Sequence, residues 1–349
     1  MTTWAEVMGD LLAGRDLDRE TAYAVMDQVM TGELGDVRLA SFLTALSAKG
    51  AGVSEVHGLA DAMQDHAESV DVADQVLDIV GTGGDRAHTV NISTMSAIVL
   101  AGAGVPVVKH GNRASTSASG SADVLEALGL NLDLAPQEVG EVFEEVGITF
   151  LFANKFHPSM RFAAGVRRQL PFPTVFNVLG PLTNPARPAA SAVGVAQEAN
   201  APLMAGVFAA RGTSALVFRG HERGLDELTT TESSQIWQVS GGVVEYAEFD
   251  AVEAFGLPRS SVGDLQGGSA TQNAQVALDV LAGAAGPVRD AVLLNAAAGI
   301  VSYALSQDPT EGALDLVTRL GAGVEEAAAS IDSGAANDVL TRWIAATRR

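Results

Sequence analysis

Two strand-like segments of this 349-residue chain each run into a glycine-rich turn that is followed by a helix-like segment. The first is DIVGTGGD at residues 78–85, ahead of NISTMSAIVLAGAG from residue 91; the second is VPVVKHGN from residue 105, ahead of SADVLEALG at residues 121–129. This repeated order of strand, loop and helix is typical of a parallel sheet covered by helices. Further apolar runs such as ITFLFA, ASAVGVA and SALVFRG continue the alternation, so the sequence predicts an α/β domain.

The first 70 residues differ because they contain only helical patterns. Three amphipathic helices are expected there: one capped by Asp18, one that places Leu39, Phe42, Leu43 and Leu46 on a single face, and one capped by Ser54. A helical pattern returns in HPSMRFAAGVRRQL. We therefore expect an α/β fold with two domains. A small all-helical domain would comprise residues 1–72 plus about 158–185, and a large domain, with a mostly parallel sheet flanked by helices, would comprise residues 73–157 plus 186–349.

Composition restricts the partners of the chain. The net charge of −21, from 42 acidic and 21 basic residues, repels polyphosphate backbones and so disfavours nucleic acid. The chain has no cysteine, so any metal is held by oxygen or imidazole ligands. The amino terminus lacks the basic and apolar pattern of a secretory signal, and the longest apolar run, SAIVLAGAGVPVV, is shorter than the ~20 residues of a membrane helix. We expect a cytoplasmic protein with no membrane partner.

The first glycine-rich turn, GTGGD, predicts an anion site. Several backbone N–H groups of such a turn converge on one point, and the dipole of the following helix favours negative charge there. Asn91 is expected to cap that helix, while Ser93 and Thr94 add hydroxyl donors in its first turn. A tight connection that uses glycine only for its positive φ remains an alternative. The turn matches neither the GxGxxG nor the GxxxxGK[ST] pattern.

The second turn carries more donors than the first. Lys109, His110, Asn112 and Arg113 follow one another closely, and four hydroxyl groups lie between residues 115 and 119. This set suits an anion with several oxygens, whereas a solvated serine-rich loop would not usually begin with so many cationic and amide groups. Ser121 is expected to cap the next helix. Two anion-binding turns at neighbouring strand ends predict a ligand with two phosphate centres.

An acidic pair, Asp226 and Glu227, follows the strand-like segment SALVFRG. Mg²⁺ prefers oxygen ligands and often bridges carboxylates to a substrate phosphate, so the pair is a candidate metal site. Adjacent acidic residues are also common on solvated surfaces. The position of the pair after a strand, beside the two phosphate-binding turns, is what favours the metal.

Six segments together resemble the anthranilate phosphoribosyltransferases: GTGGD (81–85), NIST (91–94), KHGNR (109–113), SGSADVLEALG (119–129), FNVLGPLTNP (176–185) and GLDE (224–227). They occur in the family's order and approximate spacing, and the resemblance covers nearly the whole chain. It implies a homodimer joined through the small domains. It also implies transfer of the phosphoribosyl group of 5-phosphoribosyl 1-diphosphate to the amine of anthranilate in tryptophan biosynthesis, with two Mg²⁺ ions per active site and release of pyrophosphate.

The same resemblance implies roles for individual residues. Those implied to bind the phosphoribosyl donor are Gly81, Thr82, Gly83, Gly84, Asp85, Thr89, Asn91, Ser93, Thr94, Lys109, Ser117 and Ser121. Those implied to bind anthranilate are Gly81, His110, Asn112, His157 and Arg167, with the arginine facing the carboxylate. Ser93, Asp226 and Glu227 are implied to hold the metal. No covalent catalyst is implied, because alignment and metal-assisted departure of pyrophosphate suffice.

Several alternatives remain open at this point. Without the family motif, Arg161 and Arg168 compete with Arg167, and His157 could instead order the loop before Pro158. Phe156, Ala118, Pro173 and Arg223 depart from residues common in the family, which leaves the shape of the acceptor tunnel open. A pyrimidine nucleoside phosphorylase is one rival, although a longer glycine stretch and no paired metal acids would be expected of it. A nucleic-acid-binding relative without this activity is another, and it would need a basic groove that three lysines do not supply.

Overall fold

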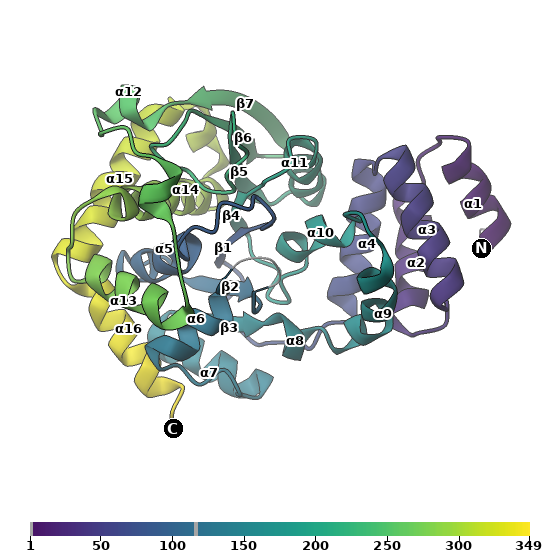
Figure 1. Cartoon of the computed structure of the whole chain (residues 1–349), viewed down its shortest axis with the longest axis horizontal. Coiled ribbons are helices and arrows are strands. Elements are labelled where there is room, and N and C mark those ends of the chain that lie inside the picture. Colours follow the sequence, from purple (N-terminus) through teal and green to yellow (C-terminus); the bar gives the residue numbers. More distant parts are fainter. Residues whose placement is uncertain (1–2, 115–117) are drawn as a thin grey trace. The chain divides into compact units, whose positions relative to one another are not determined.

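The computed structural model describes residues 3–114 and 118–349, which divide into two compact units (Figure 1). One unit comprises Met1–Ser69 and Ala153–Pro185, and the other comprises Val70–Phe152 and Ala186–Arg349. The chain leaves the larger unit after Phe152 and returns to it at Ala186. The excursion begins at Ala153, directly after a strand, and so slightly earlier than the sequence pattern suggested.

The smaller unit is built from helices. They are α1 (Trp4–Leu12), α2 (Arg19–Met30), α3 (Asp36–Lys49), α4 (Val53–Asp65), α8 (Ala153–Phe156), α9 (Arg161–Gln169) and α10 (Phe176–Leu179), with 3₁₀ turns η1 (Pro158–Met160) and η2 (Gly180–Leu182). The expectation of three helices in the first 70 residues was wrong, because α1 is a fourth. Its signal was a capping box: the Thr3 hydroxyl accepts the N–H of Glu6, and the Glu6 carboxylate accepts the N–H of Thr3.

The caps of the other amino-terminal helices were predicted with mixed success. Asp18 caps α2 as expected, since its carboxylate accepts the N–H of Thr21 at 2.7 Å. Ser54 does not cap α4; the cap is Gly52, and the Ser54 hydroxyl donates to the carbonyl of Leu17. The predicted apolar face of α3 is confirmed, because Leu39, Phe42, Leu43 and Leu46 are all buried.

The larger unit contains a seven-stranded sheet in the order β3-β2-β1-β4-β5-β6-β7. The strands are β1 (Leu77–Gly81), β2 (Val107–Gly111), β3 (Ile148–Phe152), β4 (Ala190–Gly194), β5 (Ser214–Gly220), β6 (Ser234–Ser240) and β7 (Val243–Phe249). The first five strands of this order pair in parallel, and β6 and β7 add an antiparallel extension. The predicted α/β class, with a mostly parallel sheet and a small helical domain, is confirmed.

The helices of the larger unit pack against this sheet or against one another (Figure 1). They are α5 (Ile92–Gly102), α6 (Ser121–Leu128), α7 (Pro136–Val146), α11 (Asn200–Arg211), α12 (Ala251–Phe255), α13 (Ala270–Leu281), α14 (Pro287–Gln307), α15 (Leu316–Asp332) and α16 (Ala335–Ala346), with 3₁₀ turns η3 (Val262–Leu265) and η4 (Pro309–Ala313). Among the described residues, α14 alone is long and apolar enough to cross a membrane, yet 67% of its apolar window is buried inside the unit. It contacts α5, α15, β4 and β5, as a core helix does.

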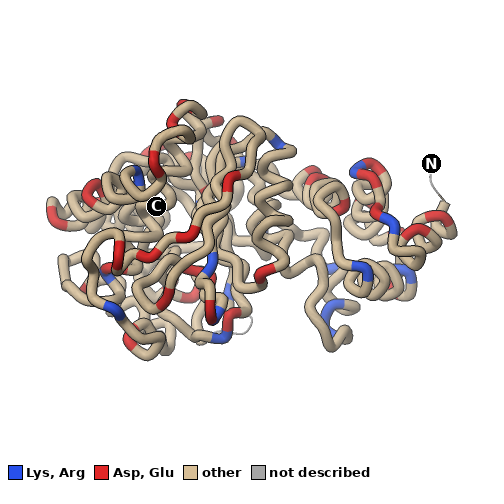
Figure 2. Tube along the Cα trace, turned by 90° about the horizontal axis from the view of Figure 1, so that it is seen from above, with Lys and Arg blue, Asp and Glu red and all other residues tan. Residues whose placement is uncertain are grey.

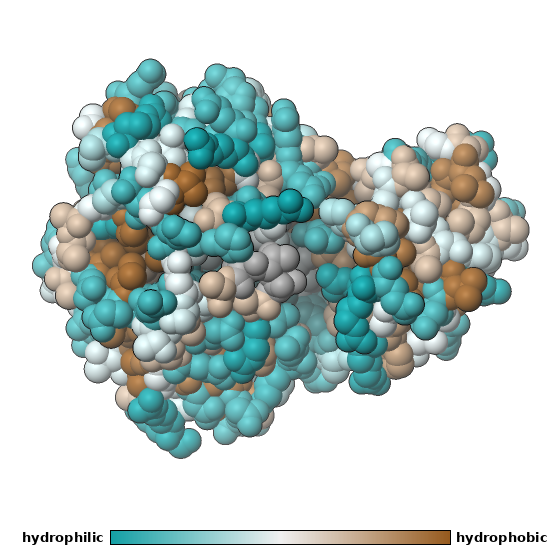
Figure 3. Space-filling model, in the orientation of Figure 1, coloured by the Kyte–Doolittle hydropathy of each residue, from teal (hydrophilic) through white to brown (hydrophobic). Residues whose placement is uncertain are grey.

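The strand order brings three loops to one edge of the sheet. Because β1, β2, β4 and β5 are parallel, their carboxyl ends meet at the same edge, where α/β proteins commonly bind ligands. The loops that follow β1, β2 and β5 are the two glycine-rich turns and the acidic pair singled out from the sequence. On the outer surface, by contrast, hydrophobic residues form only separate patches on the face shown in Figure 3.

Candidate active site

The loop after β5 lies directly over the ends of β1 and β4. The Asp226 carboxylate accepts the N–H of Gly83 at 2.7 Å, although the two residues are 143 positions apart. A Cβ atom at Gly81 would come within 2.4 Å of Asp226 Oδ2, and one at Gly194 would come within 1.6 Å of the Asp226 carbonyl oxygen. Gly83 also has a positive φ of 67°, as a tight connection requires. The turn is therefore glycine-rich both for its conformation and for the close approach of an acidic loop.

Three carboxyl groups lie close together here: Asp226 and Glu227 of this loop, and Asp85 of the loop after β1. Asp226 and Glu227 are each 8% exposed. Burial raises the pKa of Asp226 to about 7, and the negative charge of Asp85 adds to the rise. Burial also raises the pKa of Glu227 well above its ordinary value, with Asp226 and Asp85 contributing and Lys109 opposing. Such a group of like charges favours a cation among them.

Lys109 is the positive side chain of this group. It lies on β2 and is 1% exposed. Its ammonium donates to the carbonyl of Ile79 and to the hydroxyl of Ser93, 3.2 Å away in the first turn of α5. Burial lowers the pKa of Lys109, while the charges of Asp78 and Glu227 oppose that change. The structure thus places Lys109 of β2, Ser93 of α5 and Glu227 of the loop after β5 in one cluster.

The residues fit a metal that shares its coordination with a ligand. No three His, Asp or Glu side chains within the described part of the chain form a ready-made metal cage. Mg²⁺ usually retains water and binds through one or two carboxylates plus phosphate oxygens, rather than in a cage built from protein alone. The pair Asp226 and Glu227, with the Ser93 hydroxyl nearby, matches that requirement.

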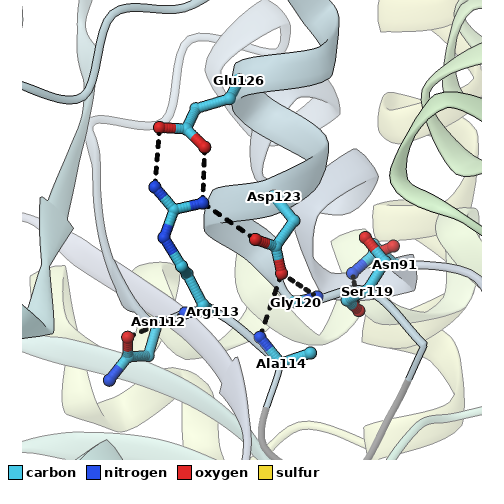
Figure 4. Close-up of polar contacts among 8 residues, drawn as sticks. All are labelled: Asn91, Asn112, Arg113, Ala114, Ser119, Gly120, Asp123 and Glu126. Carbon is cyan, nitrogen blue, oxygen red and sulfur yellow. Dashed lines mark hydrogen bonds and ion pairs between the residues drawn. The ribbon is translucent and has the colours of Figure 1, made fainter.

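The loop after β2 is held by its own helix (Figure 4). The Arg113 guanidinium donates to Asp123 at 2.9 Å and to Glu126 at 2.6 and 2.9 Å, and it lies over the ring of Phe152. The sequence suggested that Arg113 would donate hydrogen bonds to a bound anion. The structure does not support this, because its charge is already paired with Asp123 and Glu126. These two ion pairs raise the pKa of Arg113.

The cap of α6 also differs from the expectation. The N-cap is Gly120, not Ser121, and the Asp123 carboxylate reaches back to accept the N–H groups of Ala114 and Gly120 at 3.0 and 2.9 Å (Figure 4). Although burial acts in the opposite direction, these hydrogen bonds and Arg113 lower the pKa of Asp123. Ser121 is the first residue of α6, and its side chain does not cap the helix.

Asn91 connects the two glycine-rich loops. It is the N-cap residue of α5, but its side chain makes no capping hydrogen bond. Its amide donates to the Ser119 carbonyl at 3.1 Å (Figure 4), while its oxygen accepts the amide of the buried Asn273 at 2.8 Å. Sequence reasoning missed Asn273, because nothing near it in α13 indicates a contact 182 positions away.

The other residues expected in these loops lie as follows. His110 is buried, and its backbone N–H donates to the Asp78 carboxylate at 3.1 Å. Asn112 is exposed. Thr94 is buried in α5, and Thr89 forms an isolated bridge with Gln266. The remaining expected donor-binding residues of the first loop, Thr82, Gly84 and Asp85, are exposed or partly exposed. Ser117 lies outside the described residues.

His157 and Arg167 belong to the smaller unit. His157 is buried, and burial lowers its pKa to about 4, which keeps the imidazole neutral at pH 7. Arg167 retains an exposed surface, yet enough protein surrounds the guanidinium to lower its pKa, and it lies 4.9 Å from the ring centre of Phe176. Arg161 is also exposed and lies over the ring of Phe162.

Comparison with known proteins gives matches over nearly the whole chain. Residues 73–337 match the a/b domain of a glycosyl transferase family, and residues 5–67 match the helical bundle domain of that family. The chain is 55% identical to the anthranilate phosphoribosyltransferase of Arthrobacter sp. (strain FB24), over 99% of this chain and 96% of that protein. It is also 55% identical to the protein of that name from Leifsonia xyli subsp. xyli, over 99% of both.

Solved structures also match nearly the whole chain, at lower identity. A crystal structure of anthranilate phosphoribosyltransferase from Thermus thermophilus matches with a TM-score of 0.89 and 41% identity, covering 98% of this chain and 99% of that one. The Saccharomyces cerevisiae protein of that name, in complex with PRPP and Mg, matches with a TM-score of 0.85 and 29% identity, covering 99% and 97%. A structure of the same yeast protein with 4-fluoroanthranilate gives 0.83 and 27%, covering 99% and 98%.

Proposed function

The chain belongs to the anthranilate phosphoribosyltransferases, and on that premise we propose which of its residues perform the reaction. The enzyme transfers the 5-phosphoribosyl group of 5-phosphoribosyl 1-diphosphate to the amine of anthranilate in tryptophan biosynthesis. The products are N-(5-phosphoribosyl)anthranilate and pyrophosphate. The contact of Asp226 with Gly83, beside the cluster of Lys109, Ser93 and Glu227, is the observation that supports this site.

The phosphoribosyl donor would bind across the loops after β1 and β2. Its pyrophosphate and its 5-phosphate are the two phosphate centres that two donor-rich loops at neighbouring strand ends can accept. The hydrogen bond from Asn91 to Ser119 supports a shared role for these loops, since it fixes one against the other. The proposed donor-binding residues are Gly81, Thr82, Gly83, Gly84, Asp85, Thr89, Asn91, Ser93, Thr94, Lys109, Ser117 and Ser121.

Ser93, Asp226 and Glu227 would hold Mg²⁺, with two ions in each active site. The mutual repulsion of the buried carboxylates supports this assignment, and so does the yeast relative whose structure contains PRPP and Mg. Bound Mg²⁺ would neutralise charge on the departing pyrophosphate. Lys109, held close by Ser93, adds a positive charge on the same side.

Anthranilate would be held by Gly81, His110, Asn112, His157 and Arg167. The amine nitrogen forms a bond to C1 of the ribose as the bond from C1 to the pyrophosphate oxygen breaks. Pyrophosphate leaves with that electron pair, and the amine loses a proton. The protein needs no covalent nucleophile for this step, because alignment within ~3–3.5 Å of C1 supplies much of the rate. A neutral His157 leaves Arg167 as the cation for the anthranilate carboxylate.

We also propose a homodimer in the cytoplasm, with neither nucleic acid nor membrane as a partner. Acidic positions are distributed over both units and outnumber basic ones (Figure 2), which opposes binding to polyphosphate chains and anionic lipid. The mass of the enzyme in solution tests the dimer directly.

A fluorescence assay tests the proposal. Anthranilate fluorescence should fall only when both 5-phosphoribosyl 1-diphosphate and Mg²⁺ are present, and persistence of the signal under those conditions would contradict it. Arg167→Ala should raise the KM for anthranilate and leave kcat largely unchanged, since a carboxylate clamp acts alike in the ground and transition states. Arg168→Ala, which removes the neighbouring arginine of α9, is the matched control.

A further inference from the structure

The loop that carries the acidic pair is attached to helix α14 by one buried amide. The N–H of Leu228 donates to Asn295 Oδ1 at 3.2 Å, and Asn295 Nδ2 donates to the carbonyl of Leu228 at 2.8 Å. The same nitrogen donates to the carbonyl of Ala291, one turn earlier in α14, at 2.8 Å. Asn295 is completely buried, and so is Leu228. A single side chain thus pairs with both backbone groups of the residue that follows Glu227.

This pairing depends on the chemistry of the amide. Asparagine presents a donor and an acceptor side by side, and few other side chains can satisfy an N–H and a C=O of one residue together. Without it, both backbone groups of Leu228 would be buried with no hydrogen-bond partner, which is a strongly unfavourable state. The position of Leu228 relative to α14 is therefore fixed by Asn295.

The acidic pair needs such a fixed attachment. Both side chains are buried, and Asp226 also accepts the N–H of Gly83 at 2.7 Å, so the position of the loop relative to β1 decides where the two carboxylates lie. At the other end of the loop, the Glu232 carboxylate accepts the N–H groups of Glu222 and Arg223. The loop is thus attached on both sides of the acidic pair. The attachment at Leu228 is closer to the pair in sequence than the attachment at Glu222 and Arg223.

We propose that Asn295 is a positioning residue, which holds Leu228 so that Asp226 and Glu227 stay converged to bind Mg²⁺ together with the donor's pyrophosphate. This inference rests on the proposed function of the acidic pair. Asn295 touches neither substrate nor metal in this account; it acts through the backbone of Leu228. Its effect is therefore on metal affinity rather than on recognition of anthranilate.

Ser302 provides a matched control on the same helix. It is also completely buried, and its hydroxyl accepts the N–H of Leu216 at 3.0 Å and donates to the carbonyl of Ala298 at 2.7 Å. It is thus attached to strand β5 rather than to the acidic loop. Ser302→Ala and Asn295→Ala each truncate a buried polar side chain of α14 and leave a backbone N–H without its partner, and Asn295→Ala also leaves the Leu228 carbonyl without one.

The experiment measures the affinity of the full-length enzyme for Mn²⁺, as a paramagnetic probe of the Mg²⁺ site, by EPR with pyrophosphate present. Asn295→Ala should weaken Mn²⁺ binding by about 10-fold or more, the usual effect of removing a group that orients metal ligands. The Mg²⁺ concentration for half-maximal activity should rise in parallel, while the KM for anthranilate stays unchanged. Ser302→Ala should bind Mn²⁺ like the wild type.

Glu227→Gln serves as the reference that separates the two proposals. If Glu227→Gln weakens Mn²⁺ binding and Asn295→Ala does not, the positioning role of Asn295 is overturned and the metal site stands. If neither variant weakens binding, the metal site itself is rejected, and the role of Asn295 with it. Equal weakening in Ser302→Ala would also overturn the proposal, since it would show a general effect of destabilising α14. If circular dichroism shows Asn295→Ala to be unfolded, Asn295→Ser is measured against the same criteria.

Discussion

The loops after β1 and β2 are both glycine-rich turns between a strand and a helix, yet they are stabilised in opposite ways. In the first loop, the Gly83 N–H is paired with the Asp226 carboxylate, which lies 143 positions later in the chain. In the second loop, the Gly120 N–H is paired with Asp123, three positions later, and Arg113 is paired with Asp123 and Glu126 of the same helix. The first depends on a distant part of the fold, whereas the second is held mainly by its own helix, together with the hydrogen bond from Asn91 to the Ser119 carbonyl.

This difference separates the two loops functionally. A change at the acidic pair should alter the first loop and leave the second intact, because, of the described residues of the two loops, only those of the first share a hydrogen bond with that pair. A change in the ion pairs of α6 should do the reverse. The predictions below test this separation, in order of decreasing effect.

The largest effect is expected for Glu227→Gln. Loss of a carboxylate that holds Mg²⁺ removes several kcal/mol of transition-state stabilisation, so kcat/KM should fall by about 10³-fold. The same change should raise the melting temperature without Mg²⁺, because Glu227 is buried beside Asp226 and Asp85 and its charge is unfavourable in the folded state. Steady-state kinetics and calorimetry measure the two effects. A fall in both quantities would contradict the assignment of Glu227 as a metal ligand.

The second effect tests the close approach of the acidic loop to β1. In Gly81→Ala, the added Cβ would lie 2.4 Å from Asp226 Oδ2, so the carboxylate must move. A displacement of ~1 Å at a substrate-binding group can lower activity about 10²-fold, and we expect a loss of that order in kcat/KM. Gly263→Ala is the matched control in the same unit, since its nearest neighbour, Ser261 Oγ, lies at an ordinary 3.6 Å. Equal activities of the two variants would show that the approach has no functional role.

The comparison of the two loops also explains what the sequence could predict. Features set by neighbours in the chain were predicted: the five parallel strands, the apolar face of α3 and the cap at Asp18. The sequence nevertheless indicated the wrong N-cap where a glycine and a nearby serine were both candidates. Gly52 and Gly120 are the caps of α4 and α6 because an acidic residue at the third helical position pairs with the backbone N–H of each glycine, so the neighbouring Ser54 and Ser121 were not needed.

Features set by distant contacts could not be predicted. Asn273 orients Asn91 from 182 positions away, and Asn295 holds Leu228 from 67 positions away. Each is the single asparagine of its helix, and no spacing rule connects it to its partner. The close approach that requires Gly81 is also visible only once β1, β4 and the loop after β5 are brought together.

The third prediction concerns stability against pH in the absence of Mg²⁺. The pKa of Asp226 rises from 3.8 to about 7 on folding, so between these values the folded state binds more protons than the unfolded state. The contribution of Asp226 to the free energy of unfolding therefore falls as pH rises from about 4 to 7, by at most ~1.4 kcal/mol per pH unit. Denaturant titrations give the free energy of unfolding of the wild type and of Asp226→Asn. The difference between the two should show this slope with pH, and added Mg²⁺ should reduce the slope.

The Asp226→Asn data are subtracted because His157 changes the free energy of unfolding with the opposite dependence on pH. Burial lowers the pKa of His157 to about 4, so the unfolded state takes up a proton first, and stability is lost as pH falls from about 6.5 to 4. The two groups lie in different units of the chain. The contrary result is a free energy of unfolding of the wild type minus that of Asp226→Asn that stays constant across pH 4–7 without Mg²⁺. That result would disprove the buried, protonated state of Asp226.

The smallest effect is expected in the second loop. Arg113→Ala removes two ion pairs of a side chain that is 46% exposed, and exposed pairs contribute only about 0.5 kcal/mol to the free energy of unfolding. The Mg²⁺ concentration for half-maximal activity should not change, because Arg113 makes no contact with the acidic pair. Asp123→Ala, which removes a carboxylate that accepts two backbone N–H groups, should be more destabilising, at ~1–2 kcal/mol. A shift in the Mg²⁺ requirement of Arg113→Ala would show that the second loop, too, is coupled to the metal site.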